Sequence, residues 1–418
     1  MSPALSSQDI WSAYAATAER IPLPLSAVAA RLPDPADIAP REWLYGTRLI
    51  RRFVSVLAAP GGVGKSAWGL GCALAVATGR GFLGEPVHHS VPAWVFNLED
   101  PLAESERRLA ALMQFHAIPR EAAVGRLFLH SGRTRRLNMA ESGEGGIAHP
   151  DRQAVIEACL EHGIGLVVVD PFVKSHRLDE NSNADMDAAA TAWAEIAEAT
   201  GAAILLIHHV RKTANGTIDV ESTRGAKSLT DAARSAFLLV PMSPEEAKDL
   251  SVPAVERWRY IRLDDGKANL APRPAGARWF RLETVALNNA TPDYPAGDQV
   301  AAVAAWKPPS PWRGLEAADI NRALDLIAAG TGDGLAFSAH RGGRARSNPG
   351  EQRWVGRVLI DAFDRDEADA VRIIAAWLKS GLLTETPFRD PTQRKQRMGI
   401  RVDDSKRPSF TPHTGDSA

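Results

Sequence analysis

The sequence predicts an α/β protein that combines a mostly parallel sheet, an antiparallel β extension and a small carboxy-terminal domain of helical, winged-helix-like character. Residues 53–241 alternate short β-rich runs with longer helical stretches, which is typical of a parallel sheet covered by helices on both faces. After Pro241, apolar and polar residues alternate as they do in antiparallel strands. Beyond a proline-containing segment, three helical patterns precede two short strand patterns.

The bulk composition limits the number of domains and the classes of function. A chain of 418 residues can bury more than one core, so we expect two or three domains. The net charge of -1 excludes a histone-like protein that binds nucleic acid through its overall charge. Cys72 and Cys159 lie in apolar helical patterns without the spacing of a zinc site or a disulfide framework. Because the amino terminus lacks an apolar signal region and no long apolar run follows, we expect a cytoplasmic protein without membrane contact.

Shifts in composition divide the chain into segments. Residues 1–40 are rich in Ala, Pro and Ser, with one helix-like patch at 10–18. Three prolines between Lys307 and Pro311 are typical of a stiff linker. The expected segments are an amino-terminal arm (1–40), a core (41–245), a β extension of the core (246–306), a Pro-rich linker (307–314), a winged-helix-like domain (315–410) and a tail (411–418).

Strands and helices are expected in the following order. The core should contain parallel strands at 53–58, 93–98, 127–130, 166–169, 203–207 and 236–240. The extension should contain strands at 257–263 and 278–287. The carboxy-terminal domain should contain helices at 317–329, 352–362 and 366–379 and a hairpin of 382–386 with 398–402. Residues 341–418 carry 15 Lys and Arg against 11 Asp and Glu, so this domain either contacts nucleic acid or is a helical cap with a solvated hairpin.

A phosphate-binding loop follows the first core strand. Residues 59–66 match the P-loop pattern between an apolar strand and an apolar helix, although Ala replaces the first Gly. Its glycines leave backbone N–H groups free to face a phosphate. We expect Lys65 to bridge the β- and γ-phosphates of ATP and Ser66 to bind Mg²⁺. The residues expected to contact the nucleotide are Ala59, Pro60, Gly61, Gly62, Val63, Gly64, Lys65, Ser66 and Ala67.

Two further carboxylates complete the expected catalytic site. Residues 163–170 form an apolar strand that ends in Asp170, as a Walker B strand does when it holds the metal side of the site. Glu99 ends the strand that follows the P-loop helix, and we expect it beside the P-loop strand, where it could accept a proton from the attacking water. Asp100 precedes Pro101, which favours an extended backbone, so we interpret Asp100 as a turn residue or helix N-cap.

At this point five motifs together resemble the RepA-type replicative helicases, which are plasmid- and phage-borne hexameric ATPases of the RecA-like fold, similar in their motor domain to the DnaB helicases. The motifs are Arg41-Glu-Trp-Leu-Tyr45, Asn97-Leu-Glu-Asp-Pro101, Val169-Asp-Pro171, Ile207-His-His-Val-Arg-Lys212 and Arg224-Gly-Ala-Lys-Ser-Leu-Thr-Asp231. The resemblance covers about residues 40–300. It implies a RecA-like P-loop core, ATP and Mg²⁺ as cofactors, self-association as a ring of the hexamer type, and single-stranded DNA as the partner. It also makes Glu99 the catalytic base and Asp170 the Walker B residue.

The resemblance assigns three further residues. His209 occupies the position of a γ-phosphate sensor, which is usually Gln in the related helicases. Arg224 and Lys267 match positions that reach the γ-phosphate of a neighbouring subunit. The sequence departs from the family at Asn269, where a Lys-x-Arg pattern would place an arginine. Because Asn cannot supply that positive charge, the arginine finger is either Arg224 or absent.

Three loops, at 133–149, 174–185 and 212–224, should leave the same edge of the sheet and face the channel of a ring. Basic side chains on these loops could follow the phosphates of a single strand. They are Arg133, Arg135, Arg136, Lys174, His176 and Lys212. Asp179 and Glu180 in the second loop oppose such binding.

Several functions remain open from the sequence. The first is an ATP-driven motor or loader on single-stranded DNA, and the second is a RecA- or KaiC-like ATPase that switches a recombination or phage-defence complex without unwinding. A small-molecule kinase lacks an Arg-rich lid and an acceptor pocket, and Glu99 is placed to activate water. A DNA-binding regulator without enzymatic activity would not need Lys65, Glu99 and Asp170 together.

Overall fold

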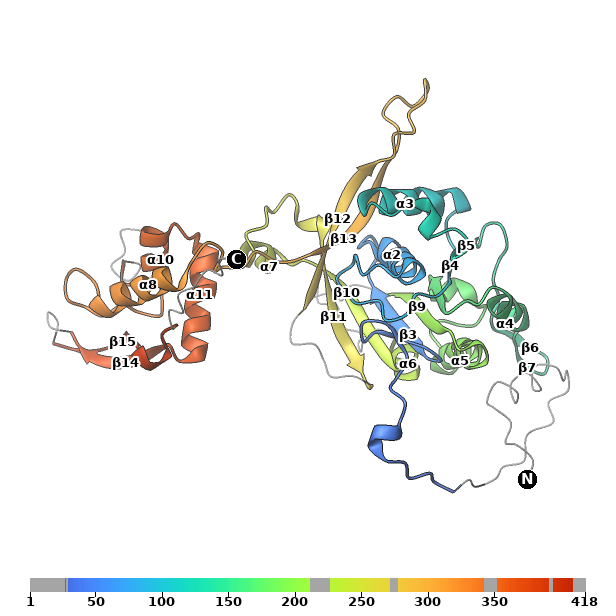
Figure 1. Ribbon diagram of the computed structural model, residues 1–418, viewed down its shortest axis with the longest axis horizontal. Helices are drawn as coiled ribbons and strands as arrows, with labels where there is room; N and C mark the ends of the chain where they lie inside the picture. The colour runs from blue at the N-terminus through green and yellow to red at the C-terminus, as the bar shows by residue number, and fades with distance from the viewer. Residues whose placement is uncertain are drawn as a thin grey trace, which may run out of the picture. The chain divides into compact units, whose positions relative to one another are not determined.

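The computed structural model describes residues 27, 29–210, 226–270, 277–341, 352–390 and 394–408. The chain divides into two units, the first made of Met1–Pro241 with Trp258–Lys307 and the second of Met242–Arg257 with Pro308–Ala418. Figure 1 shows each unit with its own layers of helices and strands. Among the described residues, no helix is both long enough and apolar enough to cross a bilayer.

The first unit is built on one sheet whose strand order is β13-β12-β11-β10-β3-β9-β8-β4-β5. Strands β10 to β5 in this order run parallel, and β10 to β13 pair antiparallel. This arrangement confirms the α/β class and the mostly parallel core expected from the sequence. The strands are β3 (Val54–Ala59), β4 (Ala93–Asn97), β5 (Leu127–Ser131), β8 (Leu166–Asp170), β9 (Ala203–His209), β10 (Ser235–Pro241), β11 (Tyr260–Ala268), β12 (Arg278–Ala286) and β13 (Gln299–Trp306).

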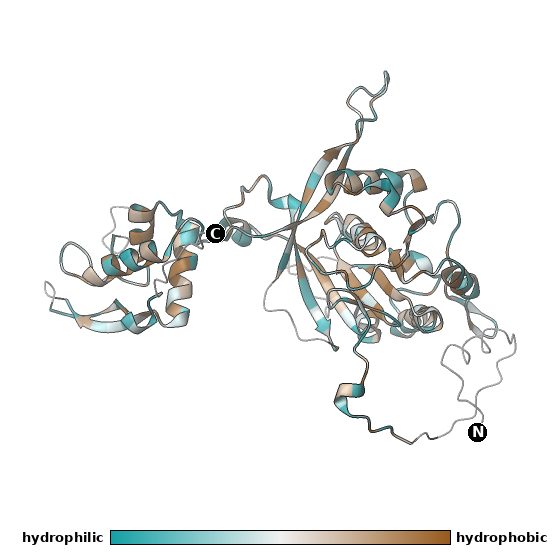
Figure 2. Cartoon of the chain, in the orientation of Figure 1, coloured by the Kyte–Doolittle hydropathy of each residue, from teal (hydrophilic) through white to brown (hydrophobic). Residues whose placement is uncertain are grey.

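Helices cover both faces of the parallel strands (Figure 1). Those on one face are α2 (Lys65–Thr78) and α3 (Leu102–Phe115), and those on the other are α4 (Arg152–Glu161), α5 (Asn183–Thr200) and α6 (Ala226–Ala232). Successive residues of β3 alternate between the two layers, because Leu57 packs in the core that contains Trp68 of α2, and Val56 packs in the core that contains Trp193 of α5. The central strands are therefore apolar on both sides and mostly brown in Figure 2.

The position of β4 corrects one expectation. The sequence analysis placed the strand before Glu99 beside the P-loop strand, but β8 and β9 lie between β4 and β3. Helix α2 crosses these two strands before the chain returns in β4. Glu99 nevertheless reaches the same end of the sheet, because the carboxyl ends of parallel strands share one edge.

The β extension has three strands instead of the two expected. Strand β13 was missed because its sequence is dominated by Ala and Val and lacks a clear apolar–polar alternation. Ala302 and Val303 of this strand are buried in the same core as Ala111 and Leu112 of α3. Packing against a helix thus defines β13, and that contact is not visible in the local pattern.

Residues 242–257 belong to the second unit, although a β extension was expected from residue 246. They contain the short helix α7 (Pro244–Asp249), which begins with a capping box between Ser243 and Glu246. The hydroxyl of Ser251 donates a hydrogen bond to the Asp366 carboxylate at 2.8 Å, which ties this segment to the second unit.

After Pro308, the described residues of the second unit contain three α-helices and a hairpin, in the order expected for a winged-helix-like domain. They are α8 (Ala317–Ala329), α10 (Gly356–Phe363), α11 (Glu367–Ser380), β14 (Leu383–Arg389) and β15 (Gln396–Val402). The helix expected from residue 352 begins at Gly356, because Trp354 forms an isolated bridge with Ser338 and is buried. The proline-containing segment packs on α11, where Arg372 donates to the Pro309 carbonyl at 2.9 Å and Trp312 lies 5.7 Å from Trp377 between ring centroids.

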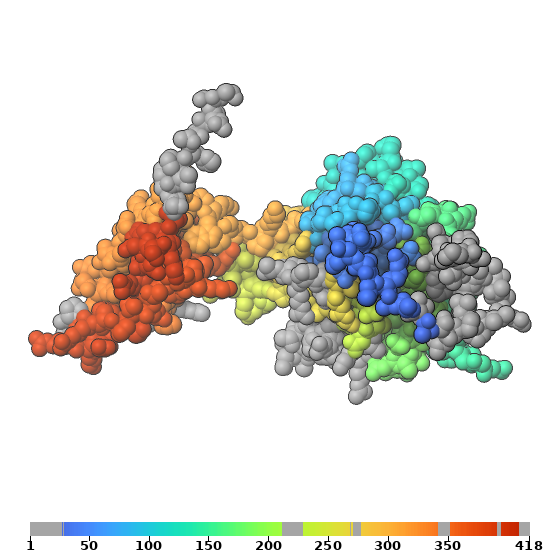
Figure 3. Space-filling model, turned by 60° about the horizontal axis from the view of Figure 1, so that its bottom comes forward, coloured from blue at the N-terminus to red at the C-terminus, as the bar shows by residue number. Residues whose placement is uncertain are grey.

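Short strands occur at the surface of the first unit. Figure 3 shows the first described residues, in blue, on that surface. They lead into β1 (Trp43–Tyr45) and β2 (Leu49–Ile50), while β6 (Glu141–Gly143) and β7 (Gly146–Ala148) form a hairpin in the loop after β5.

Candidate functional site

The P-loop joins β3 to α2 and leaves open space above its glycines. Gly62 and Gly64 have φ values of 77° and 79°, in the left-handed region that favours glycine. A Cβ at Gly61 or Gly62 would meet nothing within 4 Å, so the space above the loop is open. The first helical backbone bond runs from Trp68 N to Gly64 O, which leaves the preceding amides without helical acceptors. These amides and the positive end of the helix can hold an anion.

Ser66 and Asp170 meet at the base of the P-loop. Ser66 lies in the first turn of α2, and it lines one narrow pocket together with Asp170, which ends β8. Burial raises the pKa of Asp170, while the Ser66 hydroxyl and the Lys65 ammonium act in the opposite direction. A hydroxyl and a carboxylate beside an open phosphate cradle are the oxygen ligands that Mg²⁺ prefers, so these two residues fit the metal that ATP carries.

Glu99 lies at the start of the turn between β4 and α3, at the same edge of the sheet. The Leu98 amide donates to the Asp170 carbonyl at 2.8 Å, which attaches the turn to β8. The Asn97 side-chain oxygen accepts hydrogen bonds from the amides of Glu99 and Asp100, at 3.1 and 3.0 Å. The Glu99 side chain is exposed and close enough to Asp170 to contribute to the raised pKa of that residue. The turn therefore presents one carboxylate to solvent beside the metal-side residue.

Asp100 has a different environment. Its carboxylate forms an ion pair with Arg108 of α3 at 2.8 Å and accepts a hydrogen bond from the Asn97 amide nitrogen at 3.3 Å. Asp100 is a turn residue, as expected, but not the helix N-cap, since Pro101 occupies that position without a side-chain cap. The second carboxylate is thus used to hold the turn.

His209 completes the cluster from β9. It pairs with Ala59 across β3 and β9, which brings its half-buried ring next to the P-loop. Burial lowers the pKa of His209, and the positive charge of Lys65 lowers it further. The structure therefore brings together Lys65, Ser66, Glu99, Asp170 and His209, all of which were named from the sequence.

Of the two residues expected to act in trans, the structure describes Lys267, whose contacts lie outside this cluster. Lys267 lies on β11, and its ammonium donates to the carbonyls of Thr230 and Asp231 at 3.0 and 2.9 Å. These carbonyls belong to the last turn of α6, where a cation is favourable. Lys267 thus has a role within its own chain. Arg224 and Lys212 lie outside the described residues.

A second site adjoins the catalytic cluster. A cavity of about 860 Å³ opens between the loops that follow β4, β5 and β8, and we call it the basic pocket. Its charged or titratable lining residues are Glu99, Arg133, Arg136, Lys174, His176 and Arg177. Arg135 lies outside this lining, because its guanidinium pairs with Asp151 at 2.6 Å. Within the described residues, Arg136 and Lys174 have no ion-pair partner, so their charges are available to an anion.

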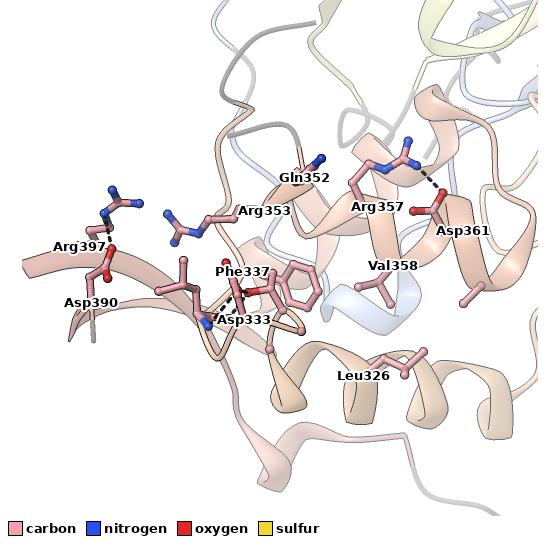
Figure 4. Close-up of a pocket in the computed structure, with 15 residues that line it drawn as sticks. Leu326, Asp333, Phe337, Gln352, Arg353, Arg357, Val358, Asp361, Asp390 and Arg397 are labelled. Carbon is pink, nitrogen blue, oxygen red and sulfur yellow. Dashed lines mark hydrogen bonds and ion pairs between the residues drawn. The ribbon is translucent and has the colours of Figure 1, made fainter. Parts of the chain in front are cut away.

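The second unit contains another cavity, of about 740 Å³ (Figure 4). Three arginines and three aspartates line it, and the dashed lines in Figure 4 join Arg357 to Asp361 and Arg397 to Asp390. Arg353 donates to the Ala336 carbonyl at 2.9 Å. The positive charges of this cavity are balanced locally, which makes it a weaker anion site than the basic pocket.

Sequence reasoning missed three residues of these sites. Asn97 and Arg108 hold the Glu99 turn and also line a narrow polar pocket beneath Ser66 and Asp170. Arg177 lines the basic pocket, although it pairs with Glu141 at 3.2 Å. An Asn two residues before a carboxylate at a strand end was a usable signal, because Asn side chains often accept the amides of a following turn. Arg108 and Arg177 carried no local signal.

A comparison with protein-family models matches residues 18–215 to the family described as the AAA domain. The matched segment contains the P-loop, the Glu99 turn, Asp170 and His209. This match agrees with the phosphate cradle and the carboxylates gathered beside it. The match and this geometry together support a P-loop ATPase.

Proposed function

We propose that this P-loop ATPase is a motor that hydrolyses ATP while it acts on single-stranded DNA, as a ring-forming replicative helicase of a plasmid, phage or other mobile element does. The observation that carries the proposal is that the basic pocket and the ATP site share Glu99. A phosphodiester chain held by Arg136 and Lys174 would lie beside the carboxylate that activates water. Binding and hydrolysis could then influence one another directly.

The residues divide the hydrolytic work by their chemistry. Lys65, whose side chain is buried at the P-loop, would neutralise charge on the β- and γ-phosphates. Ser66 and Asp170 would hold Mg²⁺, which supplies further neutralisation of the phosphate charge. Glu99 would accept the proton of the attacking water, and His209 would contact the γ-phosphate next to Lys65.

The ring part of the proposal is supported by the resemblance of the motor segment to RepA-type helicases. Because Lys267 is held by its own α6, the contribution to a neighbouring site falls to Arg224. Mass photometry with and without ATP, and with and without an oligothymidylate strand, tests assembly. A hexamer-sized species that forms with ATP supports the ring, whereas a monomer under all conditions contradicts it.

Steady-state ATP hydrolysis with and without oligothymidylate tests the motor. We expect the strand to stimulate hydrolysis, with an effect that weakens steeply as salt rises. A forked DNA duplex then separates two outcomes. Unwinding supports the helicase, and stimulation without unwinding supports an ATPase that switches a partner complex. If the strand neither binds to the protein nor stimulates ATP hydrolysis, the proposal is contradicted.

A further inference from the structure

We propose that Arg133 is a positioning residue that connects the basic pocket to Glu99, so that a polyanion bound in the pocket sets the rate of ATP hydrolysis. The inference rests on the proposed function, because it takes single-stranded DNA as the polyanion. It concerns regulation of the same site and adds a residue to which the sequence assigned only phosphate contact.

Three consecutive residues at the end of β5 attach to the turn that carries Glu99. The hydroxyl of Ser131 donates to the Asp100 carbonyl at 2.7 Å, and the Gly132 amide donates to the Asn97 carbonyl at 2.8 Å. The Nε of Arg133 donates to the main-chain carbonyl of Glu99 at 2.7 Å. The turn that carries Glu99, which we call the catalytic turn, is thus hydrogen-bonded to all three residues of the segment 131–133.

Close packing adds to these hydrogen bonds. A Cβ on Gly132 would lie 2.6 Å from the Leu98 carbonyl oxygen, so the two backbones touch with no side chain between them. Ser131 is buried, and its oxygen also accepts the Arg133 amide at 3.2 Å. Because the segments are in contact through backbone atoms, a displacement of one is transmitted to the other.

The Arg133 side chain has a second, unused end. Its Nε is occupied by the Glu99 carbonyl, but its terminal nitrogens have no partner among the described residues, and Arg133 lines the basic pocket with Arg136 and Lys174. A guanidinium carries five N–H donors in one plane, so it can bind an anion at the tip while Nε keeps its bond. Arg136 and Lys174 have no such bond to the catalytic turn among the described contacts.

This difference predicts that a substitution of Arg133 lowers a different property of the enzyme than a substitution of Arg136 or Lys174 does. A phosphate at the tip of Arg133 fixes the guanidinium and, through Nε, the residue that carries the catalytic carboxylate. A misplacement of about 1 Å can cost up to about a hundredfold in rate. Arg136 and Lys174 would contribute to affinity for the strand, whereas Arg133 would also contribute to the rate when the strand is saturating.

The test is hydrolysis of ATP by the full chain titrated with oligothymidylate, for wild type, Arg133→Lys, Arg136→Ala and Arg135→Ala. For Arg133→Lys we expect a half-saturating strand concentration close to that of wild type, since the charge is kept, and a maximal rate on the order of tenfold lower. Arg136→Ala should raise the half-saturating concentration and reach the wild-type maximum. Arg135→Ala is the matched control from the same loop, since it pairs with Asp151 outside the pocket, and it should change neither value.

The outcomes separate this inference from the proposed function. If oligothymidylate does not stimulate the wild type, the proposed function fails. If it stimulates the wild type, and Arg133→Lys reaches the wild-type maximum, the function stands and the inference is wrong. Melting temperature and affinity for a fluorescent ATP analogue are measured on each variant. They identify a variant whose maximal rate of hydrolysis is lower only because it is misfolded. In that case Arg133→Gln, which keeps a planar donor without the charge, provides the second measurement.

Discussion

Nη1 of Arg108 lies 2.8 Å from Oδ2 of Asp100, whereas the adjacent carboxylate of Glu99 has no ion-pair partner in the described part of the chain. Two neighbouring acidic residues thus have different tasks. Asp100 is held by α3 and by Asn97, and Glu99 is left exposed in the lining of the basic pocket. The ion pair engages Asp100 in holding the turn and leaves the Glu99 carboxylate open, so this difference favours Glu99 as the base.

Glu99→Gln should therefore bind ATP with nearly wild-type affinity and hydrolyse it about a hundred- to ten-thousandfold more slowly, since an amide cannot accept the proton. Asp100→Asn is the matched control, and it should keep most of the turnover while lowering the melting temperature. Single-turnover hydrolysis and equilibrium nucleotide binding measure the two effects. A Glu99→Gln enzyme with near-normal turnover, or a dead Asp100→Asn enzyme that still folds, would reverse the assignment.

Lys65→Ala should abolish ATP binding. Its buried ammonium is the cation of the P-loop, and the pKa of neighbouring Asp170 responds to it. Titration with a fluorescent ATP analogue gives the affinity. Lys174→Ala removes a cation from the basic pocket instead and should retain nucleotide binding. Equal losses in both variants would mean that the pocket, and not the P-loop alone, holds the nucleotide.

Lys267→Met should lower stability without removing a trans-acting group. Its ammonium donates to two carbonyls at the end of α6, one half-buried and one exposed, and loss of such a hydrogen bond costs about 0.5–1.5 kcal/mol. Chemical denaturation measures this loss.

Mixtures of Lys65→Ala and Arg224→Ala subunits should recover ATP hydrolysis where an intact P-loop meets an intact Arg224. Recovery in mixtures of Lys65→Ala with Lys267→Met, but not with Arg224→Ala, would identify Lys267 as the finger.

The two buried histidines, His208 and His176, lead us to predict that the folded protein loses stability in acid. Burial lowers the pKa of His208 to about 4 and the pKa of His176 to about 4, from an ordinary value of 6.5. Below pH 6.5 the unfolded chain therefore binds more protons than the folded chain, so stability is complete above that pH and falls as the pH approaches about 4. Denaturant titrations of wild type and His208→Gln should differ in this window by on the order of 1–3 kcal/mol. If the free energies of unfolding of the two proteins changed equally with pH, the prediction would be wrong.

The β14–β15 hairpin should contribute to DNA binding. Arg394 and Lys395 are exposed, and neither forms an ion pair among the described residues. Replacing both by Glu should weaken binding of single-stranded DNA and make its salt dependence shallower, because fewer counterions are released. Lys248→Glu, on exposed α7 of the same unit, is the control. Unchanged affinity for DNA and an unchanged salt dependence would favour the interpretation of this domain as a structural cap. Substitution is preferable to truncation after Pro309, which would separate α7 from its own unit.

The sequence predicted the P-loop and the two carboxylates at strand ends because their signals are local. The P-loop needs a strand, a turn of glycines and a helix within a few residues, and the structure places these as β3, Gly61–Gly64 and α2. Asp170 and Glu99 were found because each ends an apolar strand. The clustering of these residues with His209 follows from a general property of parallel sheets, whose carboxyl ends share one edge.

Other features depended on contacts between residues far apart in the chain. The order of strands places β4 two strands away from β3, and no local pattern encodes that order. The bond of Lys267 to α6, the pairing of Arg135 with Asp151 and the attachment of 131–133 to the Glu99 turn join segments separated by 15 or more residues. A basic residue in a sequence shows only its charge. Whether that charge faces solvent, neutralises an aspartate or holds a catalytic backbone is decided by the tertiary packing that brings its partner within hydrogen-bonding distance.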